Sequence, residues 1–211
     1  MEFKHADAVA LCGVATEIRQ QQAMLNDMYC LEWRKSYQAD KLALSACQEF
    51  NEMLNEVKGA WKFYGKNYQN DWAAALEEFI DVVHFMATVE LCPLESPLYE
   101  GSEEVVSQVW MISLHAKNFA LLKAINLVMR RGCFLQLLAN GCRLFRLTPE
   151  QLLVAYLHKN KKNQARAQAG AISRDVDDLK AVEQSTFDYM YENGFISMTR
   201  EEYNAKVDAN E

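Results

Sequence analysis

The stretch DWAAALEEFIDVVHFMATVEL, residues 71–91, indicates the fold class of this chain. It contains neither Gly nor Pro, and the helix-favouring residues Ala, Leu, Glu and Met make up much of it. Pro93 follows shortly afterwards and stops the predicted helix. The whole chain has the same character, because its 211 residues include only 8 Gly and 3 Pro, and 50% are apolar. We therefore expect an all-α protein, a helical bundle with a sizeable core, and exclude a disordered chain or a β-sandwich.

Helical patterns extend on both sides of this stretch. Thr148, Pro149 and Glu150 form a clear helix start, with an N-cap, a proline at the first helical position and an acid in the first turn. Thr199 and Glu202 are spaced as a capping box. The clearest loop covers residues 92–101. The predicted helices cover residues ~5–37 with a break near 29–32, ~40–64, ~71–91, ~102–130, ~133–145, ~149–168, ~175–192 and ~199–208.

The net charge of −7 is unevenly distributed. Residues 174–211 carry ten acids and four bases, which leaves the first 173 residues close to neutral. This pattern predicts a helical domain over residues 1–173 and an acidic helical extension over 174–211. An acidic chain is a poor general binder of nucleic acid, so we expect no nucleic-acid partner. The extension is also suited to bind a protein regulator or to mimic nucleic-acid charge.

The six cysteines contain no C-x-x-C pair, which excludes a zinc ribbon or a thioredoxin-type site at the level of the motif. No uncharged apolar run approaches the roughly 18 residues of a membrane span, so no membrane partner is expected. The first residues lack the basic and apolar pattern of a secretory signal. These features predict a cytoplasmic location, which is the host cytoplasm if the protein is virus-encoded.

Two pairs of acids, Glu49 with Glu52 and Glu78 with Asp81, are each spaced one helical turn apart. If the two helices pack antiparallel, four carboxylates converge on an all-oxygen site that suits Mg²⁺ or Mn²⁺. Such pairs are also common on solvated helix faces, but apolar residues surround these. The segment from Asp81 to His84 resembles the E-x-x-H motif of iron-carboxylate bundles, which need a second copy that is absent from the sequence.

A basic stretch and several amide and aromatic residues offer contacts for a nucleotide. On one helix face Lys159, Asn160, Asn163 and Arg166 present cation and amide donors suited to a triphosphate, although a basic helix end is the simpler interpretation. A second set of residues is suited to a pyrimidine base, although core packing alone also explains its ring-bearing members. This set comprises the amides Gln22 and Asn26 and the rings Trp61, His84 and Phe85.

Four blocks of the sequence carry a family resemblance. They are QAMLN at residues 22–26, Glu49 and Glu52 followed by WKFY at 61–64, EFIDVVHF at 78–85, and LTPEQLLVAYLHKNKKNQAR at 147–166. In this order they resemble the dimeric all-α dUTP diphosphatases. That family belongs to the all-α NTP pyrophosphohydrolases and includes phage members that hydrolyse dCTP or dUTP.

The resemblance implies a reaction and a homodimer. The expected activity is hydrolysis of a pyrimidine deoxynucleoside triphosphate, dUTP first, to the monophosphate and pyrophosphate. Mg²⁺, or Mn²⁺, is expected on the four carboxylates, with Glu49 orienting the attacking water. Gln22, Asn26, Trp61, His84 and Phe85 are expected at the base or sugar. Lys62, Lys159, Asn160, Asn163 and Arg166 are expected at the phosphates.

The chain departs from the family pattern after Arg166. Ala167 and Ala171 replace a Gln and a Tyr, Tyr64 replaces a frequent second Trp, and the family's closing segment is not recognisable. These positions are expected to close over the substrate, so the preferred base stays open between uracil, cytosine and a modified pyrimidine. An interaction protein on the same scaffold is the alternative from another functional class.

Overall fold

The computed structural model describes residues 5–62, 64, 68–92, 117–131, 133–168 and 183–209. All regular secondary structure in these residues is helical, which confirms the all-α prediction. None of the described helices is long and apolar enough to cross a membrane. The elements are α1 His5–Tyr29, α2 Trp33–Ser36, α3 Ala39–Glu56, the short 3₁₀ turn η1 Lys58–Ala60, α4 Trp72–Leu91, α6 Asn118–Arg131, α7 Phe134–Leu144, α8 Pro149–Gln168, α10 Thr186–Glu192 and α11 Arg200–Asp208.

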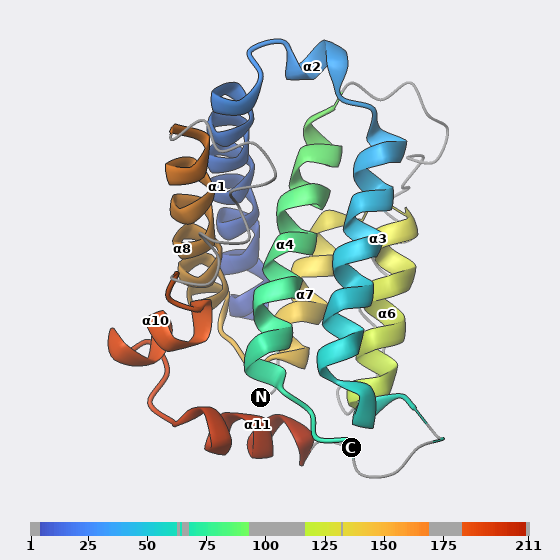
Figure 1. Cartoon of the computed structure of the whole chain (residues 1–211), viewed down its shortest axis with the longest axis vertical. Helices are drawn as coiled ribbons and strands as arrows, with labels where there is room; N and C mark the ends of the chain where they lie inside the picture. Colours follow the sequence, from blue (N-terminus) through green and yellow to red (C-terminus); the bar gives the residue numbers. More distant parts are fainter. Residues whose placement is uncertain are drawn as a thin grey trace.

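The long helices form a bundle in which the helix axes are roughly aligned, with neighbours such as α3 and α4 running in opposite directions (Figure 1). Helices α3 and α4 lie side by side and antiparallel, and this pair makes the most extensive contact between elements. Helix α8 lies against α1, and α7 lies behind α4 in the view of Figure 1 and contacts it. The bundle therefore places the acid-bearing faces of α3 and α4 next to each other, as the sequence spacing requires.

Aromatic side chains fill the lower part of the core. The rings of Phe79 and Phe145 lie 5.2 Å apart between centroids, and Trp72 meets Phe145 edge to face at 6.3 Å. Gly141 on α7 faces Phe79 so closely that a Cβ atom there would lie 2.1 Å from the ring. This glycine allows α7 to approach α4, which carries two of the candidate acids.

Helix α3 ends at Glu56, earlier than the predicted limit near residue 64, so that part of the prediction is wrong. Val57 leaves helical geometry and η1 follows. The backbone N–H of Gly59 donates to Asn70 Oδ1 at 2.7 Å, and a Cβ atom on Gly59 would lie 2.8 Å from the same oxygen. The close approach of residues 68–70 therefore turns the chain before the helix can continue.

Most other predicted boundaries agree with the structure where it describes them. The start of the helix predicted over 175–192 is wrong, because residues 183–185 are not helical and α10 begins at Thr186, where the Ser185 side chain caps it by accepting from the Asp188 N–H. The break near residues 29–32 separates α1 from α2, and Thr148 caps α8 by accepting a hydrogen bond from the Gln151 N–H at 3.2 Å. Thr199 and Glu202 form the expected capping box of α11. Three predicted stretches lie outside the described residues. They are residues 93–101 of the predicted loop, residues 102–116 of the helix predicted over 102–130, and residues 175–182 of the helix predicted over 175–192.

Helices α10 and α11 pack against the foot of α4, and α10 also contacts α8 (Figure 1). Phe187, Met190, Tyr203 and Val207 belong to the same buried cluster as the bundle core. Asp208 accepts hydrogen bonds from the side chain of Trp72 at 2.6 Å and from that of Asn70 at 2.8 Å. The division into residues 1–173 and 174–211 stays a prediction about domains, while the described part of the second segment shares the core of the first.

Candidate active site

The antiparallel packing of α3 and α4 brings three of the four predicted acids together. Glu49 and Glu52 project from α3 and Glu78 from α4, and each offers a carboxylate oxygen within 4.8 Å of the others. Three oxygen donors at this separation can hold one hard divalent cation such as Mg²⁺. The predicted acidic site therefore has a physical counterpart, which we call the acidic group.

The fourth acid, Asp81, lies one turn further along α4 and makes an ion pair. Its Oδ2 atom lies 2.8 Å from Nζ of Lys159, which is buried on α8. Asp81 is three residues after Glu78 in the sequence. Asp81 and Glu49 both line the cavity described below. The structure pairs this predicted metal ligand with a predicted phosphate ligand.

Glu78 carries the electrostatic cost of this clustering. Burial, together with the nearby carboxylates of Asp81 and Glu52, raises the pKa of Glu78 to about 7, although Lys159 opposes the shift. Burial is the largest cause of this shift, and the neighbouring carboxylates add to it. A cation bound between the carboxylates would relieve their mutual repulsion.

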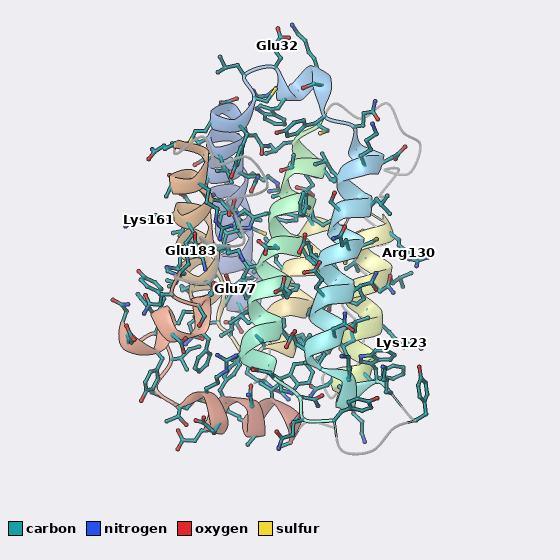
Figure 2. The ribbon with its side chains drawn as sticks, in the orientation of Figure 1. Glu32, Glu77, Lys123, Arg130, Lys161 and Glu183 are labelled. Atoms are coloured by element: carbon teal, nitrogen blue, oxygen red, sulfur yellow. The ribbon has the colours of Figure 1, made fainter. Side chains whose placement is uncertain are left out.

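Glu77, which the sequence analysis missed, holds two of the lysines on α8. Its Oε1 atom lies 2.7 Å from Nζ of both Lys159 and Lys162. Figure 2 labels Glu77 on α4 and Glu183 beside α8. Although burial opposes ionisation, the charges of Lys159 and Lys162 hold the pKa of Glu77 well below its usual range. Its signal in the sequence was weak: Glu77 lies one turn before Asp81, and the two lysines are spaced three residues apart.

A cavity of about 360 Å³ opens next to the acidic group, with Glu49 in its wall. Its lining combines polar groups at both ends with aromatic and apolar side chains, as in many small-molecule sites. Tyr29 and Tyr37 are aromatic members that the sequence analysis did not predict. The lining residues are Gln22, Leu25, Asn26, Tyr29, Tyr37, Leu42, Glu49, Asp81, His84, Phe85, Thr88, Asn163 and Arg166.

A chain of hydrogen bonds fixes the two predicted amide side chains of this cavity. Tyr156 donates its hydroxyl to Gln22 Oε1 at 2.9 Å, and Gln22 Nε2 donates to Asn26 Oδ1 at 2.9 Å. Asn26 Nδ2 then donates to Thr88 Oγ1 at 3.3 Å. Asn160 is buried and donates to the Tyr156 hydroxyl at 3.0 Å, so it supports this chain and does not line the cavity.

His84 presents an acceptor nitrogen at the same end of the cavity. Its Nδ1 atom lies 2.8 Å from the Ile80 carbonyl oxygen, and its ring stacks on Tyr156 with centroids 4.4 Å apart. Because a carbonyl oxygen only accepts, Nδ1 carries the proton of the neutral ring. Burial lowers the pKa of His84 to about 4, and among the described residues Nε2 has no hydrogen-bond partner.

Arg166 and Asn163, both on α8, are polar residues of the cavity lining. Arg166 donates from Nη1 to Asn163 Oδ1 at 3.0 Å and from Nε to Glu183 Oε1 at 3.0 Å. A second hydrogen bond joins Nη2 to Glu183 Oε2. The predicted phosphate contact is therefore a buried guanidinium held by its own helix and by the segment before α10.

Besides Lys159 and Asn160, two further predicted substrate residues are missing from the lining of this cavity, Trp61 and Lys62. They follow the C-terminal end of α3, where Trp61 Nε1 donates to the Leu54 carbonyl oxygen at 2.8 Å. Nζ of Lys62 lies over the rings of Trp61 and Tyr68, at 5.2 and 5.3 Å from their centroids. Their assignment to the substrate stays a prediction.

A protein-family model described as dUTPase matches residues 15–170, which is most of the chain. No curated protein matches the chain. The matched range includes the acidic group, the cavity lining and Arg166, and it ends before Glu183.

Proposed function

The chain belongs to the dUTPase family, and we propose that it hydrolyses dUTP to dUMP and pyrophosphate with Mg²⁺ as cofactor. The family match supports dUTP diphosphatase activity in general. One observation carries the finer proposal: Glu49 belongs both to the acidic group and to the wall of a cavity that Arg166 also lines. A triphosphate needs this combination of a cation site and a guanidinium beside a pocket for its base.

The residues present fit a hard divalent cation. The acidic group offers only carboxylate oxygens, which Mg²⁺ and Mn²⁺ accept readily. The raised pKa of Glu78 is a further sign that positive charge is favoured there. Glu49, Glu52 and Glu78 would hold the ion, with Asp81 as the proposed fourth acid. When bound, the ion supplies neutralisation of phosphate charge and a more acidic water.

The side chains of this site have separate roles in the proposed reaction. Glu49, in the cavity wall, orients the attacking water and accepts its proton. Arg166, supported by Asn163, binds phosphate oxygens through its remaining N–H groups and offsets the charge that develops on pyrophosphate. Lys159 forms ion pairs with Asp81 and Glu77 and so fixes the positions of both carboxylates.

The other end of the cavity is proposed to hold the pyrimidine ring. Phe85 lies in its wall, and the hydrogen-bonded amides of Gln22 and Asn26 present polar edges in fixed orientations. His84 adds the acceptor Nε2, which has no hydrogen-bond partner in the described part of the chain. These groups support recognition of a base by its hydrogen-bonding edge, while uracil, cytosine and modified pyrimidines remain to be compared by experiment.

Pyrophosphate release from dUTP, dCTP, dTTP, dATP and dGTP with Mg²⁺ or Mn²⁺ tests this function. We expect dUTP to be cleaved fastest, and Glu49→Gln to lower kcat at least about 100-fold, because the variant loses both a metal ligand and the proton acceptor. Asp40→Asn is the matched control, because it removes an exposed acid from the first turn of the same helix. The function fails if the wild type cleaves none of the nucleotides, and the role of Glu49 fails if its variant keeps full activity.

We further propose that the protein acts as a homodimer, as its resemblance to the dimeric enzymes implies. Light scattering of the purified chain would give the molar mass in solution. A mass close to twice that of one chain is expected, and the mass of a single chain contradicts the proposal.

A further inference from the structure

We infer that Glu183, which lies beyond the range matched by the family model, positions Arg166 for the phosphates of the substrate. This inference rests on the proposed function, because it takes Arg166 as a phosphate ligand. Glu183 is a positioning residue in this sense: it acts through the guanidinium, with no contact of its own to the nucleotide. The segment after residue 173 would then belong to the active site through at least one side chain.

The geometry of the pair leaves part of the guanidinium available. Glu183 accepts hydrogen bonds from Nε and Nη2 of Arg166, and Asn163 accepts one from Nη1. An arginine has five N–H groups, so these contacts leave one on each terminal nitrogen for phosphate oxygens. Arg166 and Asn163 line the cavity, whereas Glu183 is not among the lining residues. The carboxylate therefore holds the guanidinium without filling the cavity.

The residues that follow Glu183 are fixed to the bundle by hydrogen bonds. The carbonyl oxygen of Gln184 accepts from Nζ of Lys162 at 3.2 Å, and the backbone N–H of Thr186 donates to Glu77 Oε2 at 2.8 Å. Tyr189 on α10 stacks on His158 of α8 with ring centroids 4.0 Å apart. Glu183 therefore projects from a docked segment and can hold Arg166 in one orientation.

An arginine held in advance binds phosphate more strongly than one that must lose rotamer freedom on binding. The Arg166 side chain is 9% exposed and that of Glu183 20% exposed, so solvent screens their interaction only partly. The rival role for Glu183 is competition, in which its carboxylate occupies the phosphate position and substrate must displace it. The two roles predict opposite changes in substrate affinity.

The first test compares Glu183→Gln with the wild type in dUTP hydrolysis. We expect KM to rise about tenfold, because Arg166 is no longer held in place for the phosphates. We expect kcat to fall as well, because the same guanidinium offsets the charge that develops on pyrophosphate. Glu201→Gln is the matched control, since it removes the same charge from an exposed position on α11. A KM that falls would indicate competition, and an unchanged KM would remove Glu183 from the site; either result overturns the inference.

A double-mutant cycle tests whether Glu183 acts through Arg166. Glu183→Gln should have less than a twofold effect on KM in the background of Arg166→Lys. A lysine ammonium cannot donate the two parallel hydrogen bonds that the guanidinium donates to the Glu183 carboxylate. An undiminished tenfold effect in that background would mean a general structural role and contradict the inference. If Glu183→Gln does not fold, Glu183→Asp, which keeps the charge and shortens the side chain, takes its place in the cycle.

Equilibrium binding separates this inference from the proposed function. Calorimetry with the non-hydrolysable analogue α,β-imido-dUTP should show about tenfold weaker binding by Glu183→Gln than by the wild type. If the analogue binds but the wild type does not cleave dUTP, the proposed function fails on its own. If the wild type cleaves dUTP and both proteins bind the analogue equally, the inference fails while the function stands.

Discussion

His84 illustrates at the residue scale how burial selects one chemical state of a side chain. The Ile80 carbonyl oxygen accepts a hydrogen bond from Nδ1 of His84, and the ring stacks on Tyr156. No described residue forms a hydrogen bond with Nε2. Protonation would place a second donor in a buried position without an acceptor among the described residues, which is why its pKa falls to about 4. At neutral pH the cavity therefore offers an acceptor here.

This depressed pKa predicts a pH dependence of stability. The unfolded chain binds a proton at His84 below about pH 6.5, whereas the folded chain does so only near pH 4. The contribution of neutral His84 to the free energy of unfolding is thus fully present above pH 6.5. It is lost as pH falls toward 4, by up to about 3 kcal/mol in total. Urea unfolding between pH 7 and 5 should show a smaller loss for His84→Asn than for the wild type. Identical pH profiles would contradict the neutral, buried state.

The residue scale also shows what sequence spacing can and cannot predict. Helical spacing placed Glu49 and Glu52 on one face of α3, because residues one turn apart share a face. Their meeting with Glu78 was predicted only on the condition that the two helices pack antiparallel. Glu77 and Glu183 could not be found this way, since their partners on α8 are fixed only by tertiary packing. Trp61 was expected at the base, but its hydrogen bond to the Leu54 carbonyl oxygen depends on a turn that the spacing did not reveal.

At the scale of elements, the capped starts of α8 and α11 were predictable, whereas the start of α10 and the end of α3 were not. Caps such as Thr148 and Thr199 act through atoms close in sequence, so their residue types suffice to locate α8 and α11. The end of α3 depends instead on the contact of Gly59 with Asn70, which no helix propensity encodes. The antiparallel contact of α3 and α4, which builds the acidic group, was considered across a predicted turn between residues 64 and 71, whereas in the structure α3 ends at Glu56 and α4 begins at Trp72.

The close approach of α7 to α4 gives a prediction about stability. Gly141→Ala should destabilise the fold by about 1–3 kcal/mol, because the new methyl group would meet the Phe79 ring in a packed core. Gly13→Ala is the matched control within α1: its Cβ meets no atom within 4 Å, and alanine favours a helix by about 0.5–1 kcal/mol. Thermal unfolding should show Tm falling for the first variant and rising for the second. A Gly141→Ala protein as stable as the wild type would contradict the described packing.

At the scale of the whole molecule, the position of each charge explains more than the net value of −7. Part of the acidic excess after residue 173 is used in the fold, because Asp208 accepts from Trp72 and Glu183 pairs with Arg166. Three other acids form the acidic group on α3 and α4. The net charge argued against nucleic acid, yet the local arrangement of acids around a guanidinium is compatible with a metal-bound triphosphate.

The central claim is that the acidic group holds the cation that dUTP hydrolysis requires. The most direct test measures pyrophosphate release from dUTP as Mg²⁺ is added to EDTA-treated protein, for the wild type and for Glu78→Gln. We predict no release without metal, saturation with Mg²⁺ for the wild type, and a midpoint at least about tenfold higher for Glu78→Gln, because one carboxylate ligand is lost. Release in EDTA, or equal Mg²⁺ midpoints for the two proteins, would contradict the account.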